Sequence, residues 1–263
     1  MKRNPILSAF LITGMLVATP PLIAAQSGTT EDFLGHPVGK TFHTPEQAVS
    51  SLAYLPPPPV ADSPEFNRDK SAYQDGYGMK GSERWKQATD DADLHVPNIA
   101  KIFSEPLGVT ISAESTPTLY KMLGYILVDT GDYATKTAKE HYMRQRPFVY
   151  FHHHTCQPES EEAALRANGS YPSGHTADAQ TIGLMLSQLR PERAADIMKR
   201  SYEFGQSRVI CGAHWQSDVD AGRVVGAVEY ARLQSIPEFR GMLDEAQSEI
   251  TKQADLLSAK TVH

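Results

Sequence analysis

Hydrophobic residues in the middle of the chain recur with the period of an α-helix. Over residues 119–127 they occupy positions i, i+3, i+4, i+7 and i+8, so they share one helical face. Thr116 followed by Pro117 is a typical N-cap and first-turn pair, and we expect the helix to begin there. Its buried face is predicted to consist of Leu119, Met122, Leu123, Ile126 and Leu127.

Helical patterns continue to the C-terminus. Residues 132–146 read as helix and should stop at or before Arg146, because Pro147 disfavours the α conformation of the preceding residue. The inward face of the next helix, over residues 175–190, is predicted to hold Ile182, Met185, Leu186 and Leu189.

Three more helices follow, over residues 191–210, 217–234 and 239–257. Pro191 opens the first of them, and Ser217 is the expected cap of the second. Few runs alternate with period 2, and no internal repeat is found. The sequence therefore predicts an all-α fold, a single-domain helical bundle.

The N-terminus has the layout of a secretory signal peptide. Lys2 and Arg3 precede an apolar run over residues 6–18, and small residues at Ala24 and Ala25 mark a cleavage site. A membrane anchor is the alternative, but the run falls short of the roughly 20 apolar residues that span a bilayer. We predict a signal peptide over 1–25, an N-terminal arm over 26–45, a helical domain over 46–263, and a mature protein located outside the cytoplasm.

Four consecutive prolines, Pro56 to Pro59, cannot continue a helix. They predict a stiff polyproline II segment. A surface strap is the favoured interpretation, and an SH3-type ligand is the alternative.

The composition of the chain argues against some classes of binding partner. The 263-residue chain is 40% hydrophobic, enough for a sizeable core. Its net charge is −6, and removal of the two N-terminal cations makes it −8. This acidic balance argues against nonspecific nucleic-acid binding, and no further stretch is apolar enough to cross a membrane.

Cys156 and Cys211 are the two cysteines of the chain. An exported compartment permits them to form a disulfide, which is the favoured interpretation. Two separate buried thiols are the alternative.

The first segment with candidate chemistry is "YPSGHT", which precedes the helix over 175–190. Gly174 lets the backbone approach a ligand closely, and the N–H groups of the following helix attract anions. Taken alone, the string is a weak signal, and a turn that merely caps the helix is the favoured interpretation.

The second and third segments supply cations and an oriented histidine. Lys139 and Arg146 are seven residues apart, so on a helix both would leave nearly the same face, whereas Arg144 would leave another. Arg208 can bind an oxyanion bidentately, and Asp218 lies four residues after His214. A solvated basic helix end and a structural His–Asp pair are the respective alternatives.

Taken together and in this order, "KEHYMRQRP", "SYPSGHT" and "SRVICGAHWQSDVD" resemble the acid phosphatase and vanadium haloperoxidase superfamily. The match is closest to bacterial class A nonspecific acid phosphatases, which are periplasmic. "LPPPP" and "GDYATKTAKEHYMR" are also similar to that family, so the resemblance runs from about Ser50 to the C-terminus.

The resemblance implies a metal-independent, cofactor-free phosphatase acting on phosphate monoesters. His214 would be the nucleophile that forms a phosphohistidine, Asp218 would orient it, and His175 would protonate the leaving alcohol. It also implies vanadate inhibition and a homo-oligomer, and leaves phosphotransfer to alcohols open. The residues that would bind the phosphate oxygens are Lys139, Arg146, Ser173, Gly174 and Arg208.

Several rival functions share part of this pattern. A vanadium haloperoxidase would hold vanadate in the same cradle, and a membrane lipid phosphatase would need several spanning helices. A phosphate-binding protein has no use for the two histidines, and Ser173 lacks the Gly-x-Ser-x-Gly elbow of a serine hydrolase. The run of His152, His153 and His154 lacks the ligand spacing of a zinc site, so we expect a loop without metal.

Overall fold

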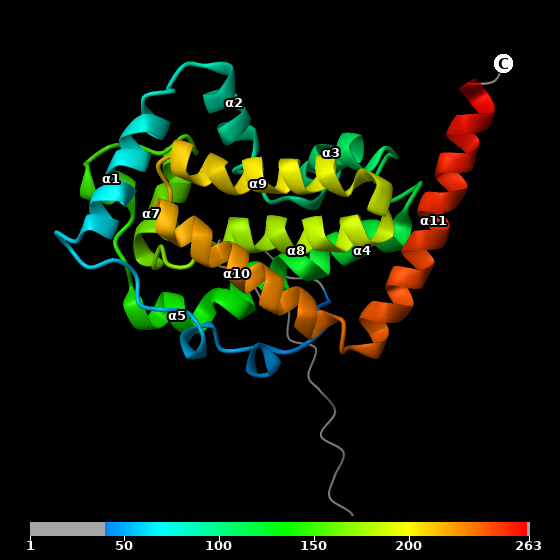
Figure 1. Ribbon diagram of the computed structural model, residues 1–263, viewed down its shortest axis with the longest axis horizontal. Coiled ribbons are helices and arrows are strands. Elements are labelled where there is room, and N and C mark those ends of the chain that lie inside the picture. Colours follow the sequence, from blue (N-terminus) through cyan, green and yellow to red (C-terminus); the bar gives the residue numbers. More distant parts are fainter. Residues whose placement is uncertain (1–39, 262–263) are drawn as a thin grey trace, which may run out of the picture.

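The computed structural model describes residues 40–261, and every regular element in this range is a helix (Figure 1). The predicted all-α fold is therefore confirmed. The predicted signal peptide and most of the predicted arm lie outside the described residues. No helix within residues 40–261 combines the length and apolarity needed to cross a bilayer.

The first half of the described chain contains short 3₁₀ turns and small helices. They are η1 (Pro45–Gln47), η2 (Ser51–Ala53), α1 (Pro64–Tyr77), α2 (Glu83–Asp90), α3 (Val96–Leu107) and α4 (Pro117–Ile126). A π-helical segment, η3 (Leu127–Ala134), joins α4 to α5 (Thr135–Tyr142). The short α6 (Pro147–Tyr150) and α7 (Glu159–Ala167) follow.

The second half contains the longer helices. They are α8 (Gly174–Leu189), α9 (Ala194–Ile210), which follows the 3₁₀ turn η4 (Pro191–Arg193), α10 (Gln216–Leu233) and α11 (Pro237–Thr261). The helices expected over 175–190, 191–210, 217–234 and 239–257 are thus present, with ends shifted by a few residues.

Helix α8 lies at the centre of the bundle, packed against α9 on one side and α10 on another, with η3 and α4 also in contact (Figure 1). Its predicted inward residues, together with those predicted for α4, are buried in one hydrophobic core, except that Leu127 is only half-buried against it. The buried members are Leu119, Met122, Leu123, Ile126, Ile182, Met185, Leu186 and Leu189. The hydrophobic period therefore identified the core faces correctly.

The predicted caps have mixed outcomes. Helix α4 begins at Pro117 with Thr116 as its N-cap, as expected. Ser217 is not the cap of α10, because the helix starts one residue earlier and Trp215 is its N-cap. The carboxylate of Asp218 accepts the Trp215 N–H at 2.8 Å and satisfies the helix end in place of Ser217.

The predicted proline strap lies on the surface. Pro56 and Pro57 are exposed and belong to no helix. The Pro56 carbonyl accepts a hydrogen bond from the Tyr171 hydroxyl at 2.7 Å. The strap is thereby fastened beside the turn that precedes α8.

The last residues of the predicted arm also pack onto the bundle. Phe42 belongs to the main core, and its N–H donates to Asp129 at 2.9 Å. The buried His43 ring lies 2.7 Å from the Glu229 carboxylate of α10. These contacts tie the segment before η1 to both η3 and α10.

Helices α8 and α10 approach each other closely enough to require glycine. A Cβ on Gly222 would lie 2.6 Å from the Ser173 carbonyl oxygen, and one on Gly226 would lie 2.4 Å from the Ala177 carbonyl oxygen. Neither atom belongs to a flexible side chain. The two backbones would therefore have to separate to admit even one methyl group.

We predict that Gly226→Ala lowers the free energy of unfolding by about 1–3 kcal/mol, because it overpacks this backbone contact. Gly241→Ala on α11 is the matched control, since a Cβ there would meet nothing within 4 Å. The control should be neutral or stabilising by up to about 1 kcal/mol, the gain in helix propensity. Urea unfolding of both variants tests this, and equal midpoints would contradict the proposed contact.

Candidate active site

The three segments singled out by the sequence meet beside the N-terminal ends of α8 and α10. Arg146 contacts His214, with 2.9 Å between Nη1 and Nε2. Ser173 donates its backbone N–H to the carbonyl of Asp218 at 2.9 Å. Arg208 comes from the last turn of α9 and is fully buried. Residues from four helical segments thus converge on one small region.

Hydrogen bonds fix the tautomer of His214. Its Nδ1 lies 2.8 Å from the Ser170 carbonyl, which can only accept, so Nδ1 carries the proton. In the neutral ring Nε2 then has a free lone pair, which faces the Arg146 guanidinium. Burial, followed by the charges of Arg146 and Lys139, lowers the pKa of His214 well below 6.5. The ring is therefore neutral, with its lone pair toward the cations.

Two buried cations, Arg146 and Arg208, and the half-buried Lys139 act electrostatically on this imidazole. Burial and the charge of Arg146 lower the pKa of Lys139 to about 7 and that of Arg208 to about 9. Burial lowers the pKa of Arg146 to about 10. The Nε–H of Arg208 has no hydrogen-bond partner among the described residues. Such a group of donors favours an anion.

Lys139 and Arg146 do not meet in the way that their spacing predicted. Helix α5 ends at Tyr142, and Met143 adopts a left-handed conformation with φ of 40°. Arg146 lies beyond this break, where it is the N-cap of α6. The shared-face argument was therefore wrong. The two cations approach each other across this break in the helix.

Backbone groups hold both cations in place. Lys139 donates from Nζ to the Gly169 carbonyl at 3.1 Å. Arg146 donates from Nε to the Leu165 carbonyl at 2.8 Å and from Nη1 to the Ala213 carbonyl at 3.0 Å. Because these acceptors are neutral, they orient the cations and leave their positive charge uncancelled.

The turn before α8 serves as a helix cap and also as part of the site. Ser173 is the N-cap, and its hydroxyl accepts from the Thr176 N–H at 3.4 Å. Gly174 is the first helical residue, and a Cβ there would lie 2.9 Å from the Gly131 carbonyl oxygen of η3. The free N–H groups of this helix end add to the positive potential around His214.

His175, in the first turn of α8, is buried. Its Nε2 donates to the Ala92 carbonyl at 3.0 Å, in the link between α2 and α3. Burial, then the charge of Arg208, lowers the pKa of His175 well below 6.5. Both histidines of the site are therefore neutral in the phosphate-free protein.

Asp218 approaches His214 but is not its nearest acceptor. Asp218 Oδ2 lies 3.5 Å from His214 Nδ1, farther than the Ser170 carbonyl. His214 also lies before the start of α10, so the pair is not the i, i+4 helical pair that the spacing predicted. Ser170, which the sequence analysis did not place in the site, supplies the closer contact.

Arg144 is a second residue that sequence reasoning missed. Its guanidinium donates to Asp218 Oδ1 at 2.5 Å and to Asp69 Oδ2 at 2.7 Å. Helical geometry had placed Arg144 away from the site, but the chain leaves the helix before this residue. In the sequence, the only indication of a role for Arg144 was its position between Lys139 and Arg146.

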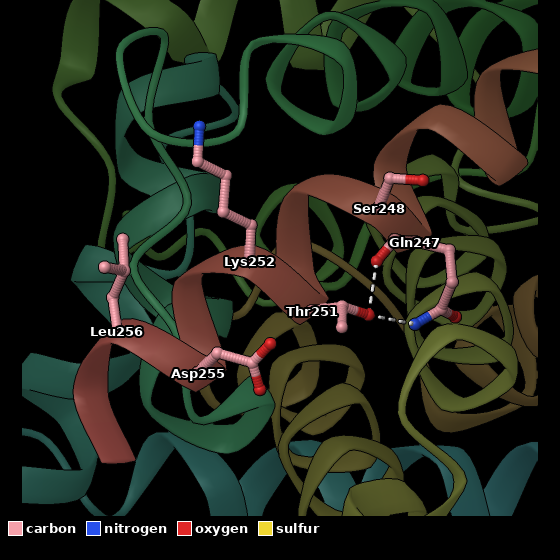
Figure 2. Close-up of a pocket in the computed structure, with 6 residues that line it drawn as sticks. All are labelled: Gln247, Ser248, Thr251, Lys252, Asp255 and Leu256. Carbon is pink, nitrogen blue, oxygen red and sulfur yellow. Dashed lines mark hydrogen bonds between the residues drawn. The ribbon is translucent and has the colours of Figure 1, made fainter. Parts of the chain in front are cut away.

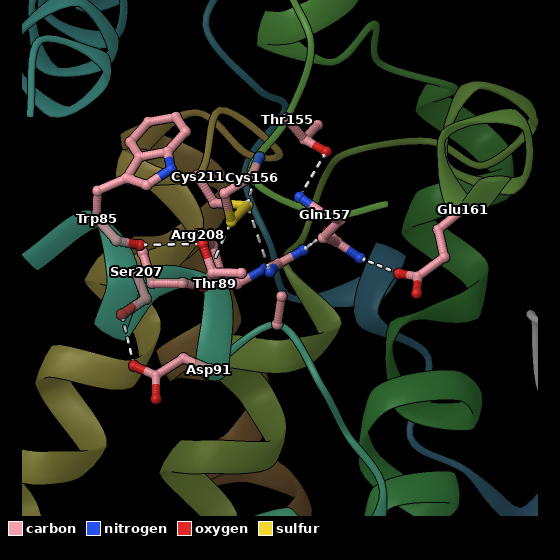
Figure 3. Close-up of a disulfide and its surroundings, with 12 residues drawn as sticks. Trp85, Thr89, Asp91, Thr155, Cys156, Gln157, Glu161, Ser207, Arg208 and Cys211 are labelled. Atoms are coloured by element: carbon pink, nitrogen blue, oxygen red, sulfur yellow. Dashed lines mark hydrogen bonds between the residues drawn. A yellow bond between two sulfur atoms is a disulfide. The ribbon is translucent and has the colours of Figure 1, made fainter. Parts of the chain in front are cut away.

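The cysteines form a disulfide, as favoured from the sequence (Figure 3). Cys156 precedes α7, and Cys211 follows α9 directly. Gln157, the neighbour of Cys156, accepts a hydrogen bond from Arg208 Nη2 and donates to Glu161 (Figure 3). The bridge therefore secures a segment that helps to hold Arg208.

The histidine run has separate contacts. His153 stacks on Tyr77 with 4.6 Å between ring centroids, and its Nδ1 lies 2.6 Å from the Tyr73 hydroxyl. His154 lies 3.2 Å from Glu162. Within residues 40–261 no cluster of three or more potential metal ligands is found.

Two hollows differ in their relation to these residues. A cleft of about 200 Å³ reaches Arg146 and is bordered by residues 143–146, Val149, Arg166 and residues 168–169. A more open hollow of about 590 Å³ lies along α11 (Figure 2). Its lining, which includes Gln247, Thr251 and Lys252, contains none of the predicted site residues. Of the predicted site residues, Arg146 lines the smaller cleft, whereas none lines the hollow along α11.

Reduction of the disulfide should lower stability much more than it alters the chemistry of the site. The bond closes a loop of 55 residues in sequence separation, worth about 4 kcal/mol on the chain-entropy estimate. Thermal unfolding with and without reductant, and of the Cys156→Ser/Cys211→Ser double variant, measures this. An unchanged melting temperature would contradict the expectation.

Comparison with known proteins agrees with the geometry. The PAP2 superfamily model matches residues 119–235, a range that contains all eight predicted catalytic and phosphate-binding residues. The chain is 54% identical over 243 residues to the non-specific acid phosphatase of Salmonella typhimurium, covering 92% of this chain and 94% of that protein. It is 43% identical over 244 residues to that of Providencia stuartii, covering 93% and 94%. The acid phosphatase of Zymomonas mobilis is 36% identical over 239 residues, covering 88% and 89%.

Proposed function

The chain belongs to the PAP2 superfamily and is an acid phosphatase, and from this premise we propose that it hydrolyses phosphate monoesters through a phosphohistidine at His214. The observation that carries the proposal is the fixed tautomer of His214. Its proton is on Nδ1, held by the Ser170 carbonyl, and its Nε2 lone pair faces the buried Arg146 guanidinium. A neutral imidazole in this setting is a nucleophile beside an anion site.

In the first step His214 Nε2 attacks phosphorus as the bond from phosphorus to the ester oxygen breaks. His175 gives its proton to the departing alcohol. In the second step water attacks the phosphohistidine, His175 takes a proton from that water, and the bond from Nε2 to phosphorus breaks. Inorganic phosphate leaves, and both histidines return to their starting states.

Charge stabilisation comes from the protein's own donors. The equatorial oxygens of the transferred phosphoryl group would be bound by Lys139, Arg146 and Arg208, with the backbone N–H groups of Gly174 and the Ser173 hydroxyl beside them. Because the cations are already fixed by neutral carbonyls, they need little reorganisation during the reaction. This set supports the predicted metal-independent mechanism.

His175 and His214 need opposite protonation states, and the incoming phosphate supplies the difference. His214 attacks as a neutral ring, whereas His175 has to carry a proton to give to the alcohol. Burial keeps His175 neutral in the phosphate-free protein. The negative charge of a bound phosphate raises its pKa, so substrate binding would recruit the proton that the reaction uses.

Broad substrate use, export and assembly are further parts of the proposal. The relatives' names include the word non-specific, and every group assigned above contacts the phosphoryl part of a substrate. A signal peptide over residues 1–25 supports a periplasmic location. A homo-oligomer, vanadate inhibition and some phosphotransfer to alcohols are supported by the family resemblance.

The first test is hydrolysis of p-nitrophenyl phosphate by the mature protein in EDTA, with vanadate titrated in. Wild type should turn over without metal and be inhibited by vanadate, and His214→Ala should lose about 10³-fold or more in kcat. His141→Ala, which removes an exposed histidine of α5, is the matched control and should keep full activity.

Full activity of His214→Ala would move the nucleophile elsewhere. An inactive wild type would favour the haloperoxidase or binding-protein function.

Activity should fall as the pH rises. The lowered pKa of His175 means that the free enzyme carries this proton only at acid pH, so kcat/KM should decline from acid toward alkaline conditions. Bound phosphate raises that pKa, so the decline in kcat should lie at higher pH than the decline in kcat/KM. His175→Asn should lose the alkaline decline in kcat, whereas His141→Asn should retain it. A wild-type profile that is flat from weakly acid to alkaline pH would contradict the assignment.

A further inference from the structure

A chain of buried charged side chains runs from α1 to His214. Asp69 Oδ2 accepts from Arg144 Nη2 at 2.7 Å, and Arg144 Nη1 donates to Asp218 Oδ1 at 2.5 Å. The three side chains are 3%, 9% and 0% exposed, respectively. We propose that Asp69 and Arg144 are positioning residues that hold Asp218, and through it His214, ready to attack phosphorus. The inference rests on the phosphatase function proposed above.

Asp218 is fixed at both carboxylate oxygens. Oδ1 accepts from Arg144, and Oδ2 accepts from the Trp215 N–H at 2.8 Å while lying 3.5 Å from His214 Nδ1. The carboxylate therefore cannot rotate toward or away from the imidazole without breaking one of these bonds. Its distance from His214 is set by Arg144 on one side and by the start of α10 on the other.

Arg144 is itself held from several directions. Its guanidinium lies 5.5 Å from the centre of the Trp215 ring and 5.9 Å from that of Phe66. It also donates to the Ser217 hydroxyl at 2.8 Å. Asp69 accepts from the Ser217 N–H and hydroxyl at 2.8 and 2.6 Å. Asp69 thus joins Arg144 to the first turn of α10.

A second route links Arg144 to the same imidazole. The Arg144 backbone carbonyl accepts from the Ser170 N–H at 2.9 Å, and the Ser170 carbonyl accepts from His214 Nδ1 at 2.8 Å. Both acceptors near the Nδ1 proton, the Asp218 carboxylate and the Ser170 carbonyl, are therefore attached to Arg144. Displacement of this one residue would disturb both.

Charge explains what this arrangement contributes to the reaction. When Nε2 bonds to phosphorus, the imidazole keeps its Nδ1 proton and becomes cationic, so an ionised Asp218 stabilises it. Burial raises the pKa of Asp218, and Arg144 acts against that rise. Asp218 also interacts electrostatically with three other titratable groups, which are Lys139, Arg146 and Tyr171. Without Arg144, Asp218 would take up a proton at a higher pH.

Asp69 also extends the site beyond the region shared with the superfamily. The family match covers residues 119–235, whereas Asp69 lies on α1. The small N-terminal helices therefore do more than cover the bundle. One of them, α1, carries Asp69, which holds Arg144. Arg144 in turn orients Asp218 beside His214.

The test compares Asp69→Asn, Arg144→Gln and Arg144→Lys in the full chain, with p-nitrophenyl phosphate as substrate. Asp69→Asn and Arg144→Gln should lower kcat by about 10–100-fold, as loss of an orienting partner does at other sites, and leave KM nearly unchanged. The acid side of the Arg144→Gln profile of kcat should move to higher pH, and Arg144→Lys should restore part of the rate. Asp220→Asn is the matched control. Asp220 lies on α10, as Asp218 does, and it also pairs with an arginine, but its side chain is exposed.

Two measurements distinguish a failure of the positioning role from a failure of the proposed phosphatase function. Nitrogen-15 histidine NMR of the phosphate-free protein reports the His214 tautomer without any turnover, and Arg144→Gln should shift its Nδ1 proton signal. An inactive wild type would overturn the phosphatase function. Unchanged kcat and His214 signals in Asp69→Asn and Arg144→Gln would overturn the positioning role. Rate losses that merely follow melting temperature, with an unshifted pH profile, would also overturn it.

Discussion

Helices α8 and α10 touch backbone to backbone at Ser173, whose N–H bonds to the carbonyl of Asp218 and whose own carbonyl lies against Gly222. This contact joins the turn that carries His175 to the helix start that follows His214. Neither element can shift alone, because no side chain lies between them to absorb the movement. The separation of the two histidines is therefore set by the packing of α8 against α10.

Removing several cations from water is the cost of the same arrangement. Arg146 and Arg208 are buried and Lys139 is half-buried, and burial is the largest cause of their lowered pKa values. Their hydrogen bonds go to neutral acceptors, so the cations are oriented without being neutralised. In the proposed mechanism, the negative charge of a phosphate ester offsets this cost, and the prearranged cations favour the transition state.

The sequence predicted the elements better than their junctions. The period of apolar residues located α4 and α8 and their core faces, because burial of a stripe is a local property of a helix. The left-handed residue Met143 carries no such pattern, so the route from Lys139 to Arg146 was predicted wrongly. The cap of α10 was also missed, since Asp218 took the role assigned to Ser217. Asp69 was out of reach, because a partner 75 residues from Arg144 leaves no periodic trace.

The disulfide makes the protein sensitive to the redox conditions around it. The bond adjoins Gln157, whose side-chain oxygen accepts from Arg208, so it secures one of the residues that hold this guanidinium. A newly made chain in a thiol-rich compartment lacks that brace, and it gains the brace only where oxidants are present. The bond thereby makes the stability of the folded protein depend on an oxidising environment, whereas the chemistry of the site is expected to depend on it much less.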